Sequence, residues 1–499
     1  MPTAWLSGVE ASRRWQSLWV TAARGVSGLL GIAVPLVVVR ALDQTTFGYY
    51  KELFLVSATA SGLLGLGITA SLYHLVPRFP QFGQTLLAQS ALLLGMLGLS
   101  GGVGLLAAGP LLQGLFHAPL AIYLPWVAFL VALSLPVSLL YVAPVVDRRS
   151  RLAALVLAGF EILRSAALVV IVMVTRSLVA LLVTGCVVMA LQCAALVTYL
   201  VWRRRTQAPQ KDAGLLRAQL RYALPFAAAA FVGLCRDKLH AYYVGGTVTP
   251  AEFAVYAVGL MQVPLIDYLT QTLGDVVVLE NSAHFAAGRV DEMRRVWYRA
   301  AYGLALVALP LFAFAELFAC DIIVVLFGAS YASAAPIFRV YATTLPLSLL
   351  FASPLLRATG DLRAMLSADL ASLLVSAGAL VLLVGRFGPI GAVGSLVAGY
   401  ATFVLWASRL NAARLELPVG RFLPWAALTR VLLVSVGTAL IAWFAFANTA
   451  AAVRLLLGGA LGLGLYAATA WRAGLVPAEE RRLVSDALRH LRLLVTGNA

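Results

Sequence analysis

Runs of about twenty apolar residues recur along almost the whole chain, and they constrain its fold more than any other feature. Coiled as a helix, such a run is long enough to cross the ~30 Å hydrocarbon core of a bilayer. Of the 499 residues, 62% are hydrophobic and only 12% are charged, which is too little charge for a soluble chain of this length. Lipid offers the backbone no hydrogen bonds, so lipid-facing segments must be helical. The runs therefore predict an all-α polytopic membrane protein.

The pattern predicts about 14 membrane spans with short connections and no extramembrane domain. The predicted spans are residues 16–39, 53–76, 85–109, 120–145, 152–174, 178–202, 219–244, 253–279, 300–320, 336–356, 364–385, 389–410, 424–446 and 450–471. After the last span, residues 477–495 place apolar side chains on one helical face and mostly charged ones opposite. This tail is therefore expected to be an amphipathic helix on the cytoplasmic leaflet.

The basic residues predict the orientation. With the N-terminus inside, 26 of the 37 Lys and Arg residues fall in inside segments. Only Arg40, Lys51, Arg176 and Arg386 fall outside. Because cytoplasmic loops carry an excess of positive charge, we expect both termini in the cytoplasm and an even number of spans.

One stretch of sequence occurs twice. Residues 135–146 read LPVSLLYVAPVV and residues 345–356 read LPLSLLFASPLL, with six of twelve positions identical and two prolines eight residues apart in each copy. A proline removes a hydrogen bond from a helix interior, so a repeated pair is stronger evidence of duplication than repeated leucines. We expect the four prolines to bend their helices around a cavity rather than to contact substrate. They are Pro136, Pro144, Pro346 and Pro354.

Two further matches extend this repeat. F-x-x-Y occurs at residues 47–50 and 253–256, and F-x-A-x2-A-x3-P occurs at residues 116–125 and 327–336. Six spans per copy is an even number, so both copies enter the membrane in the same sense, as in transporters built from parallel repeats. We therefore expect two six-helix lobes followed by two more helices and the tail. The predicted divisions are residues 1–205, 206–411, 412–472 and 473–499.

Charged side chains within spans indicate where function resides, because they are costly in lipid and usually face a cavity or each other. Arg24 lies well inside the first span, Arg236, Asp237 and Lys238 interrupt the seventh, and Asp267 lies near the middle of the eighth. We predict that Arg24, Arg236 and Lys238 line a water-filled lumen and bind a substrate head group. Asp237 and Asp267 are expected to pair with cations there or to couple transport to an ion. The alternative for the whole group is buried structural pairing.

The other charges within spans have simpler explanations. Glu161 and Arg164 are three residues apart and can pair on one helix face. Arg339, Arg430 and Arg454 lie near span ends, from where a long side chain reaches the interface.

The central group carries both signs of charge. Arginine in a cavity suits an anionic substrate such as a pyrophosphate-linked lipid sugar. Aspartate there would instead suit coupling to H⁺ or Na⁺, so the sequence leaves the energy source open.

The sequence predicts neither an enzyme nor a cofactor. It contains no P-loop, no His or Cys pair with metal-ligand spacing and no nucleophile elbow. All four cysteines lie in or beside apolar runs, as small core residues do. The net charge of +16 does not indicate nucleic-acid binding, because most basic residues lie in loops on one side, where they would face anionic lipid.

Three motifs resemble the polysaccharide-repeat (Wzx-type) flippases of the multidrug/oligosaccharidyl-lipid/polysaccharide exporter superfamily. They are RALxxxxFGxY at residues 40–50, LGIxxSL at residues 66–72 and FGxxYxxxxP at residues 327–336. The fourteen-span layout and the two extra C-terminal spans also fit that family.

The resemblance implies an alternating-access flippase of the bacterial inner membrane. Its substrate would be an undecaprenyl-diphosphate-linked oligosaccharide destined for surface polysaccharide such as O-antigen, lipopolysaccharide or exopolysaccharide. A polysaccharide polymerase and a chain-length regulator would be its partners. Arg24 matches the family's tendency to carry a basic residue in the first span.

Three other functions were weighed. A lipid II flippase would be expected to have several arginines in the first spans, and a cation-coupled drug exporter would be expected to have carboxylates in span 1. Here span 1 has one arginine and no carboxylate. A glycan polymerase or ligase would need a large outside loop with catalytic Arg or His, and none of the predicted loops is that long.

Overall fold

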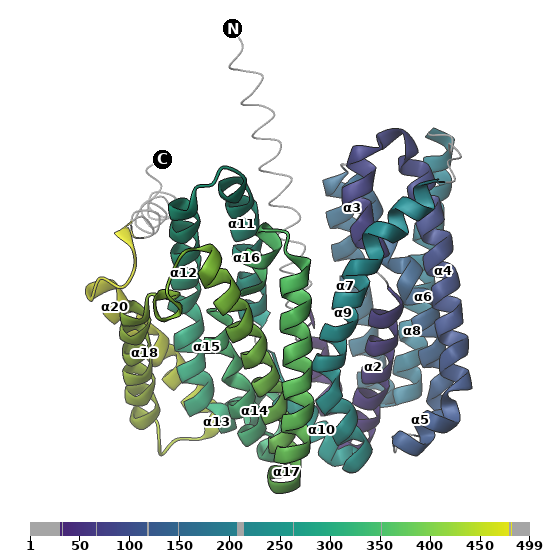
Figure 1. Ribbon diagram of the computed structural model, residues 1–499. Helices are drawn as coiled ribbons and strands as arrows, with labels where there is room; N and C mark the ends of the chain where they lie inside the picture. The colour runs from purple at the N-terminus through teal and green to yellow at the C-terminus, as the bar shows by residue number, and fades with distance from the viewer. Residues whose placement is uncertain are drawn as a thin grey trace, which may run out of the picture. The chain divides into compact units, whose positions relative to one another are not determined.

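The computed structural model describes residues 30–31, 33–65, 67–116, 119–147, 149–206, 214–262, 264–350, 352–478 and 481 (Figure 1). Over these residues the regular secondary structure is helical throughout. Ten of the described helices are long and apolar enough to cross a membrane. The all-α polytopic class is thus confirmed, while the total of fourteen spans stays a prediction. The first predicted span and the amphipathic tail lie mostly outside the described residues.

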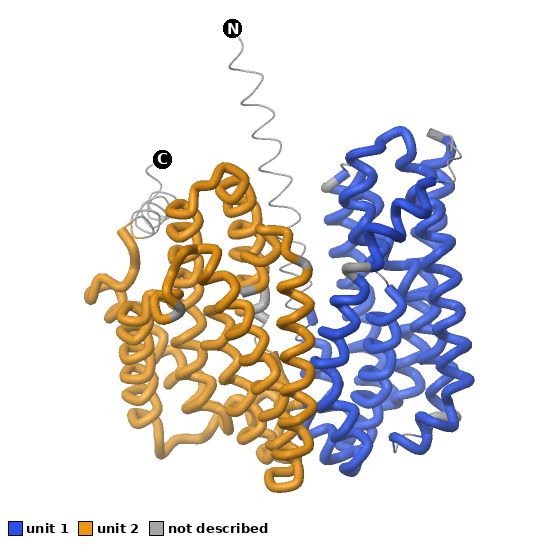
Figure 2. The backbone as a smooth tube through the Cα atoms, viewed as in Figure 1, with its two compact units in different colours: residues 1–257 blue, residues 258–499 orange. Residues whose placement is uncertain are grey.

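The chain divides into two compact units, residues 1–257 and 258–499 (Figure 2). The division falls within helix α10 (Pro250–Gly259), later than the lobe boundary that the repeat predicts. The helix that corresponds to the seventh predicted span, α9 (Gly214–Thr247), packs against α2 (Gln44–Leu64) and α3 (Ile68–Arg78) of unit 1. The division into sequence lobes stays a prediction.

Unit 1 is a bundle of long helices, most of which match single predicted spans. They are α2 (Gln44–Leu64), α3 (Ile68–Arg78), α4 (Gly83–Ala107), α5 (Gly109–Leu115), α6 (Leu120–Val146), α7 (Ser150–Thr175), α8 (Leu178–Thr206), α9 and most of α10. The second predicted span is interrupted between α2 and α3, where Gly67 has φ +65°. A residue with a Cβ rarely adopts this conformation, which explains the glycine in the LGIxxSL motif.

Helices α4 and α6 pack closely in unit 1. A Cβ at Gly98 would lie only 2.2 Å from the carbonyl oxygen of Ala132, and one at Gly102 would lie 2.8 Å from that of Ala128. Pro136 has no N–H, so the carbonyl of Ala132, four residues earlier, lacks its usual helical donor. Gly98 lets α4 approach this carbonyl, and small residues spaced in this way are typical of membrane-helix contacts.

A buried ion pair ties together one end of unit 1. The guanidinium of Arg203, at the end of α8, donates to both carboxylate oxygens of Asp147 at 2.7 Å and to Gln84 Oε1 at 2.6 Å. The hydroxyl of Tyr199 donates to Asp147 at 2.6 Å. Because Arg203 is only 5% exposed, this set of bonds compensates the cost of burying its charge.

Unit 2 contains shorter helices and more interruptions. They are α11 (Pro264–Ala286), α12 (Val290–Leu317), α13 (Ala319–Phe327), α14 (Ala335–Ala342), α15 (Thr344–Ser348), α16 (Ala352–Ala358), α17 (Leu362–Arg414), α18 (Trp425–Ala445), α19 (Ala451–Val453) and α20 (Gly459–Arg472), with a π-helical turn at Arg454–Gly458. Label α17 covers two helices that meet at Gly388, whose φ is +54°, with Pro389 starting the second helix. These two helices correspond to the eleventh and twelfth predicted spans.

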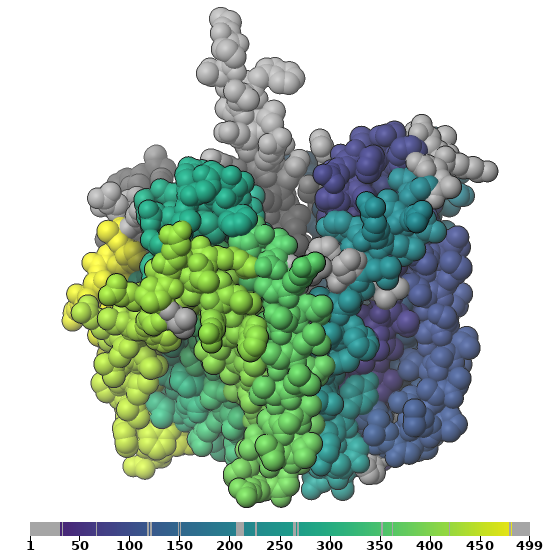
Figure 3. All heavy atoms as spheres, viewed as in Figure 1, coloured from purple at the N-terminus to yellow at the C-terminus, as the bar shows by residue number. Residues whose placement is uncertain are grey.

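The surface of α17 is apolar, as a lipid-facing helix requires. It forms much of the visible face of unit 2 in Figure 3, and Leu374, Val381 and Leu382 are each more than 70% exposed. Such a surface would be insoluble in water and is expected in a bilayer.

The two copies of the repeated stretch share one detail and differ in another. Ser138 donates to the carbonyl of Leu135 at 2.5 Å, and Ser348 donates to that of Leu345 at 2.6 Å. However, α6 is one helix through its prolines, whereas the second copy is divided into α15 and α16. Pro346 and Pro354 each stand third in a short helix, where a missing N–H costs little. The expected distortion is thus an outright break in the second copy.

Candidate functional site

Two of the predicted lumen residues lie outside the structural description. Arg24 belongs to the first 29 residues, and the side chain of Asp267 is likewise not described. Their assignment to a lumen stays a prediction.

The charges of α9 are partly neutralised within that helix. Arg236 Nε lies 2.8 Å from Asp237 Oδ1, and the side chains are 12% and 51% exposed, respectively. Lys238 follows directly and forms no ion pair with any described carboxylate. It lies nine residues from the Thr247 end of α9, about 14 Å at 1.5 Å per residue. Lys238 is therefore a cation near the Arg236–Asp237 pair for which no ion-pair partner is found among the described carboxylates.

His240, two residues further along α9, has a structural role. It is 3% exposed, and its Nδ1 lies 2.6 Å from the hydroxyl of Tyr256, which is itself fully buried. Because Tyr256 belongs to α10, this bond joins two helices that follow each other in the chain. The second F-x-x-Y motif thus supplies the hydrogen-bond partner of a buried histidine.

The two F-x-x-Y motifs lie close together in unit 1. Phe47 and Phe253 are both buried, and a Cβ at Gly48 would lie 1.9 Å from the carbonyl oxygen of Pro250. The first turns of α2 and α10 are therefore in contact. A glycine is required at position 48 because the backbone of α10 occupies the space of a side chain.

Sequence reasoning missed two charged residues of α2. The helix begins at Gln44, nine residues before the predicted second span, so Lys51 and Glu52 are two turns inside it. Lys51 Nζ lies 5.2 Å from the ring centroid of Phe47, within the range of a cation–π interaction, and Glu52 is 1% exposed. The signal was available in the sequence, because Asp43 followed three residues later by Thr46 is a typical helix start.

The remaining charges within spans are mostly paired. Glu161 and Arg164 form the expected i, i+3 pair at 2.8 Å. Arg454, expected only to reach the interface, instead binds both oxygens of the buried Asp321 at 2.8 Å. Arg339 donates to the backbone carbonyl of Glu316 at 3.0 Å.

Among the described His, Cys, Asp and Glu residues, no group of three is arranged to hold a metal ion. The described charged side chains within two membrane helices of unit 1 can bind a ligand through charge and hydrogen bonds. They are Lys238 and the Arg236–Asp237 pair on α9, and Lys51 and Glu52 on α2.

Long apolar helices, interrupted helices and charges inside the spans together define a polytopic membrane protein. Solved structures with the same fold agree. The lipid II flippase MurJ in an inward closed conformation has a TM-score of 0.70 and 11% identity, covering 92% of this chain and 100% of that chain. A multidrug resistance MATE transporter of the MOP superfamily in an inward-facing conformation has a TM-score of 0.59 and 14% identity, with coverages of 78% and 94%. A MOP superfamily transporter from Pyrococcus furiosus has a TM-score of 0.58 and 15% identity, with coverages of 80% and 94%.

The sequence itself identifies the family. No curated protein matches the chain. The family described as polysaccharide biosynthesis protein matches residues 37–336, which is more than half of the chain. The chain belongs to this family, and it has the fold of MurJ and of MATE transporters of the MOP superfamily, in agreement with the resemblance found in the motifs.

Proposed function

We propose that the protein is an alternating-access flippase for undecaprenyl-diphosphate-linked oligosaccharide repeat units. It would move them from the cytoplasmic to the periplasmic leaflet of the bacterial inner membrane, for surface polysaccharide synthesis. The observation that carries this proposal is the family match over residues 37–336. A polysaccharide polymerase and a chain-length regulator would then act on the delivered units.

The charges of α9 support an anionic substrate. A lysine within a membrane helix that has no ion-pair partner is costly in lipid and is stabilised when an anion approaches it. Lys238 meets this description among the described residues. In the proposal, Lys238 and Arg24 bind the diphosphate, and Arg236 joins them when Asp237 no longer holds it.

Coupling to H⁺ or Na⁺ belongs to the same proposal. Protonation of Asp237, or a cation bound beside it, would weaken the 2.8 Å contact with Arg236 and free that guanidinium for substrate. Asp267 would be the second coupling carboxylate. An ion gradient could then drive a cycle in which substrate binding and ion binding alternate.

A second candidate is lipid II flipping, and its only support is the similarity of fold to MurJ. The 11% identity to MurJ adds no evidence about the substrate. A drug exporter is favoured in the same way by the MATE fold.

Complementation separates these functions. The gene is expressed in three bacterial strains: one that lacks its repeat-unit flippase, one depleted of its lipid II flippase, and one that lacks its main drug exporters. We expect surface polysaccharide to return in the first strain only. Rescue of growth in the second, or of drug resistance in the third, would replace the proposal.

The same assay tests the residues of the site. In the first strain, Arg24→Ala is expected to abolish rescue and Arg24→Lys to retain part of it. Normal polysaccharide with Arg24→Ala, at wild-type protein levels, would remove Arg24 from the proposed site.

A further inference from the structure

Three helices of unit 1 come together at one end. Helix α6 ends at Val146, α7 begins at Ser150, and α8, which ends at Thr206, packs against both (Figure 1). The basic-residue pattern predicts that this end faces the cytoplasm. Residues 147–151, between α6 and α7, and residues 202–213, at and after the end of α8, include seven basic and two acidic residues. With both acidic residues counted as paired, five basic residues remain, so this part of the chain carries a surplus of positive charge.

The charge of Arg203 is already balanced within the unit. Its guanidinium donates to both carboxylate oxygens of Asp147 at 2.7 Å, and Tyr199 donates to the same carboxylate at 2.6 Å. Asp147 is thus occupied, and Arg149 forms no ion pair with a described carboxylate. Arg149 and Arg205 are both exposed, so their charges lie at the surface.

An aromatic side chain holds Arg149 in a defined position. The guanidinium carbon of Arg149 lies 4.2 Å from the ring centroid of Trp202, within the range of a cation–π interaction. The ring of Trp202 is in turn 5.9 Å from that of Tyr199, whose hydroxyl is bonded to Asp147. The backbone N–H of Arg149 donates to the carbonyl of Pro144 at 2.8 Å. Because a cation–π contact does not neutralise a charge, Arg149 is a positioned cation that can still bind an anion.

Exposed apolar side chains continue from these cations along α7 and α8. They include Leu155, two turns into α7, and Val197 and Val201 in the last turns of α8. Trp202 follows this apolar surface directly and is also exposed. A tryptophan between charged and apolar side chains is typical of the interface between membrane and water. A ligand that fits both parts needs an anionic group at the level of Arg149 and apolar chains along the helices.

We propose that Arg149, Trp202 and Arg205 form a binding site for the head group of an anionic phospholipid, with phosphatidylglycerol as the simplest example. Arg205 follows Trp202 by three residues, so both lie on the same side of α8. The phosphate would accept charge-assisted hydrogen bonds from the two guanidinium groups. The acyl chains would lie along the exposed apolar surface of α7 and α8.

Charge and surface together select this ligand. A zwitterionic phospholipid carries an ammonium group, which balances its phosphate and is repelled by the surplus of arginines. Inorganic phosphate has no apolar chain to cover the exposed leucine and valines. The site belongs to a single unit and requires no transported substrate, so it does not depend on the proposed function.

Native mass spectrometry of the full-length protein in a neutral detergent tests the site, because it resolves individual bound lipids. The probes are dioctanoyl phosphatidylglycerol and dioctanoyl phosphatidylcholine, which differ only in the head group. The wild type is expected to bind the first phosphatidylglycerol at least about tenfold more tightly than the first phosphatidylcholine. Arg149→Gln and Arg205→Gln are each expected to weaken phosphatidylglycerol about tenfold, through loss of a charge-assisted bond, and to leave phosphatidylcholine unchanged. Trp202→Leu is expected to weaken phosphatidylglycerol about threefold, and Trp202→Phe less, because phenylalanine keeps a ring under the cation.

Arg363→Gln is the matched control, because it removes an exposed basic residue from unit 2 on the same predicted side of the membrane. If it weakens phosphatidylglycerol as much as Arg149→Gln does, the lipid responds to overall charge and there is no site. Equal affinity of the wild type for the two lipids, or displacement of phosphatidylglycerol by an equal concentration of inorganic phosphate, would also overturn the proposal. Thermal unfolding without lipid shows whether each variant is folded. Since Arg205 is exposed in the last turn of α8, Arg205→Gln carries the same test if Arg149→Gln fails to fold.

Discussion

At the scale of single residues, a charged side chain can bind substrate only where it is not already held in an ion pair. The sequence predicts a cationic cluster on α9, but Arg236 is already bound to Asp237 at 2.8 Å. Lys238, which is likewise adjacent to Asp237 in the sequence, has no such partner among the described residues.

Lys238→Met is therefore expected to reduce rescue of surface polysaccharide by at least about tenfold, since a charge-assisted contact is lost. Lys238→Arg should retain most of the activity, because it keeps the positive charge. Arg217→Met, at an exposed position of the same helix, serves as the control for insertion and expression. Gel analysis of polysaccharide at matched protein levels measures the effect. Equal loss in the Lys238→Met and Arg217→Met variants would contradict a specific role.

The ion pair of Arg454 with Asp321 is expected to contribute to stability. Its guanidinium binds both oxygens of Asp321, which is only 3% exposed, and it also donates to the carbonyl of Ala447 at 2.8 Å. Arg454→Lys keeps the charge but cannot reproduce this planar arrangement. We expect a loss of about 1–3 kcal/mol in the free energy of unfolding, measured by thermal unfolding in detergent. An unchanged transition would mean that charge alone is sufficient at this position.

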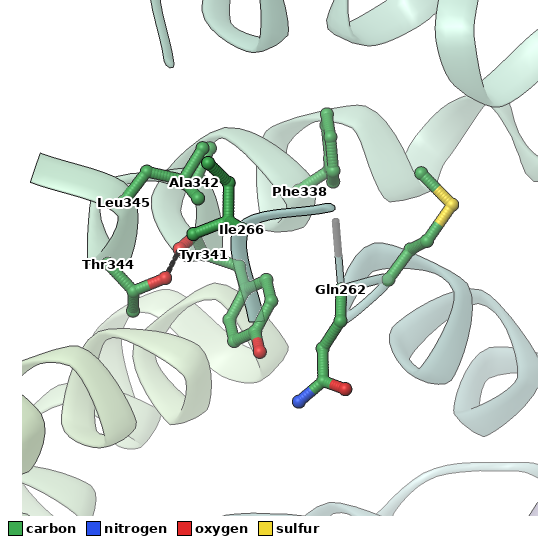
Figure 4. A pocket seen from close by; sticks show the side chains of 8 residues that line it. Gln262, Ile266, Phe338, Tyr341, Ala342, Thr344 and Leu345 are labelled. Carbon is green, nitrogen blue, oxygen red and sulfur yellow. Dashed lines mark hydrogen bonds between the residues drawn. The ribbon is translucent and has the colours of Figure 1, made fainter. Parts of the chain in front are cut away.

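At the scale of helices, one proline pattern gives two outcomes. Pro136 leaves a carbonyl that α4 covers through Gly98, and α6 remains one helix. No described glycine contact of this kind is found at the carbonyl that Pro346 leaves without a donor. There the chain breaks into short helices beside a small cavity that Gln262 and Tyr341 line (Figure 4). The sequence of the proline-containing stretch cannot distinguish these outcomes, because the deciding residue is on a neighbouring helix.

Gly98→Ala is expected to destabilise the protein by about 1–3 kcal/mol, because its Cβ would lie 2.2 Å from the Ala132 carbonyl oxygen and force α4 away from α6. Gly104→Ala, on the same helix, is the control, since nothing lies within 4 Å of the added Cβ. Thermal unfolding of both variants tests the difference. If Gly98→Ala is as stable as Gly104→Ala, the close contact is not what requires a glycine.

The helix starts at α2 and α10 predict a pH dependence. Hydrogen bonds from Thr46 lower the pKa of Asp43 below its ordinary value of 3.8, and bonds from Thr249 lower the pKa of Glu252 below 4.5. Carboxylates with a lowered pKa stabilise the fold above their unfolded pKa and lose this contribution as the pH falls through the folded value.

Asp43→Ala should therefore cost about 0.5–2 kcal/mol at pH 7, the usual cost of losing an N-cap. The difference from the wild type should shrink below about pH 4, where the wild-type carboxylate becomes protonated. Unfolding measured from pH 7 to pH 3 gives this comparison. A constant difference over that range would show that the carboxylate charge does not contribute.

At the scale of the whole molecule, the sequence predicts uninterrupted spans well. The predicted span 152–174 corresponds to α7, which runs from Ser150 to Thr175. The predicted span 85–109 corresponds to α4, which runs from Gly83 to Ala107. The sequence predicts continuous helices where the structure has interrupted ones, because hydropathy averages over the few residues that break a helix. In the described parts of these breaks, residues 260–262 and 349–350, every residue except Gln262 is apolar, as in the helices around them.

The candidate site was less predictable than the fold. The charged positions on α9 could be identified from sequence, because charge stands out in an apolar span. The small cavity in unit 2 that Gln262 and Tyr341 line could not, because its described lining residues come from two separate stretches of the chain that the sequence does not show to lie together. Lys51 and Glu52 were missed for a different reason, since they lie in the part of α2 that precedes its apolar run.

The orientation of the whole molecule follows from its basic residues and can be tested directly. Since 26 of the 37 Lys and Arg residues fall in inside segments, alkaline phosphatase fused after Arg176 or Arg386 is expected to be active, because the enzyme folds only in the periplasm. Fusions after Thr206, Arg289 or Arg472 are expected to be inactive and to fluoresce when green fluorescent protein replaces the phosphatase. The fusions after Arg289 and Arg386 carry the most weight, because the interrupted spans with residues 260–263 and 349–351 lie before them. If either break turned the chain back instead of letting it cross, every fusion beyond that break would report the opposite side. Such an inversion would also place the part of unit 2 beyond that break in a different relation to the membrane.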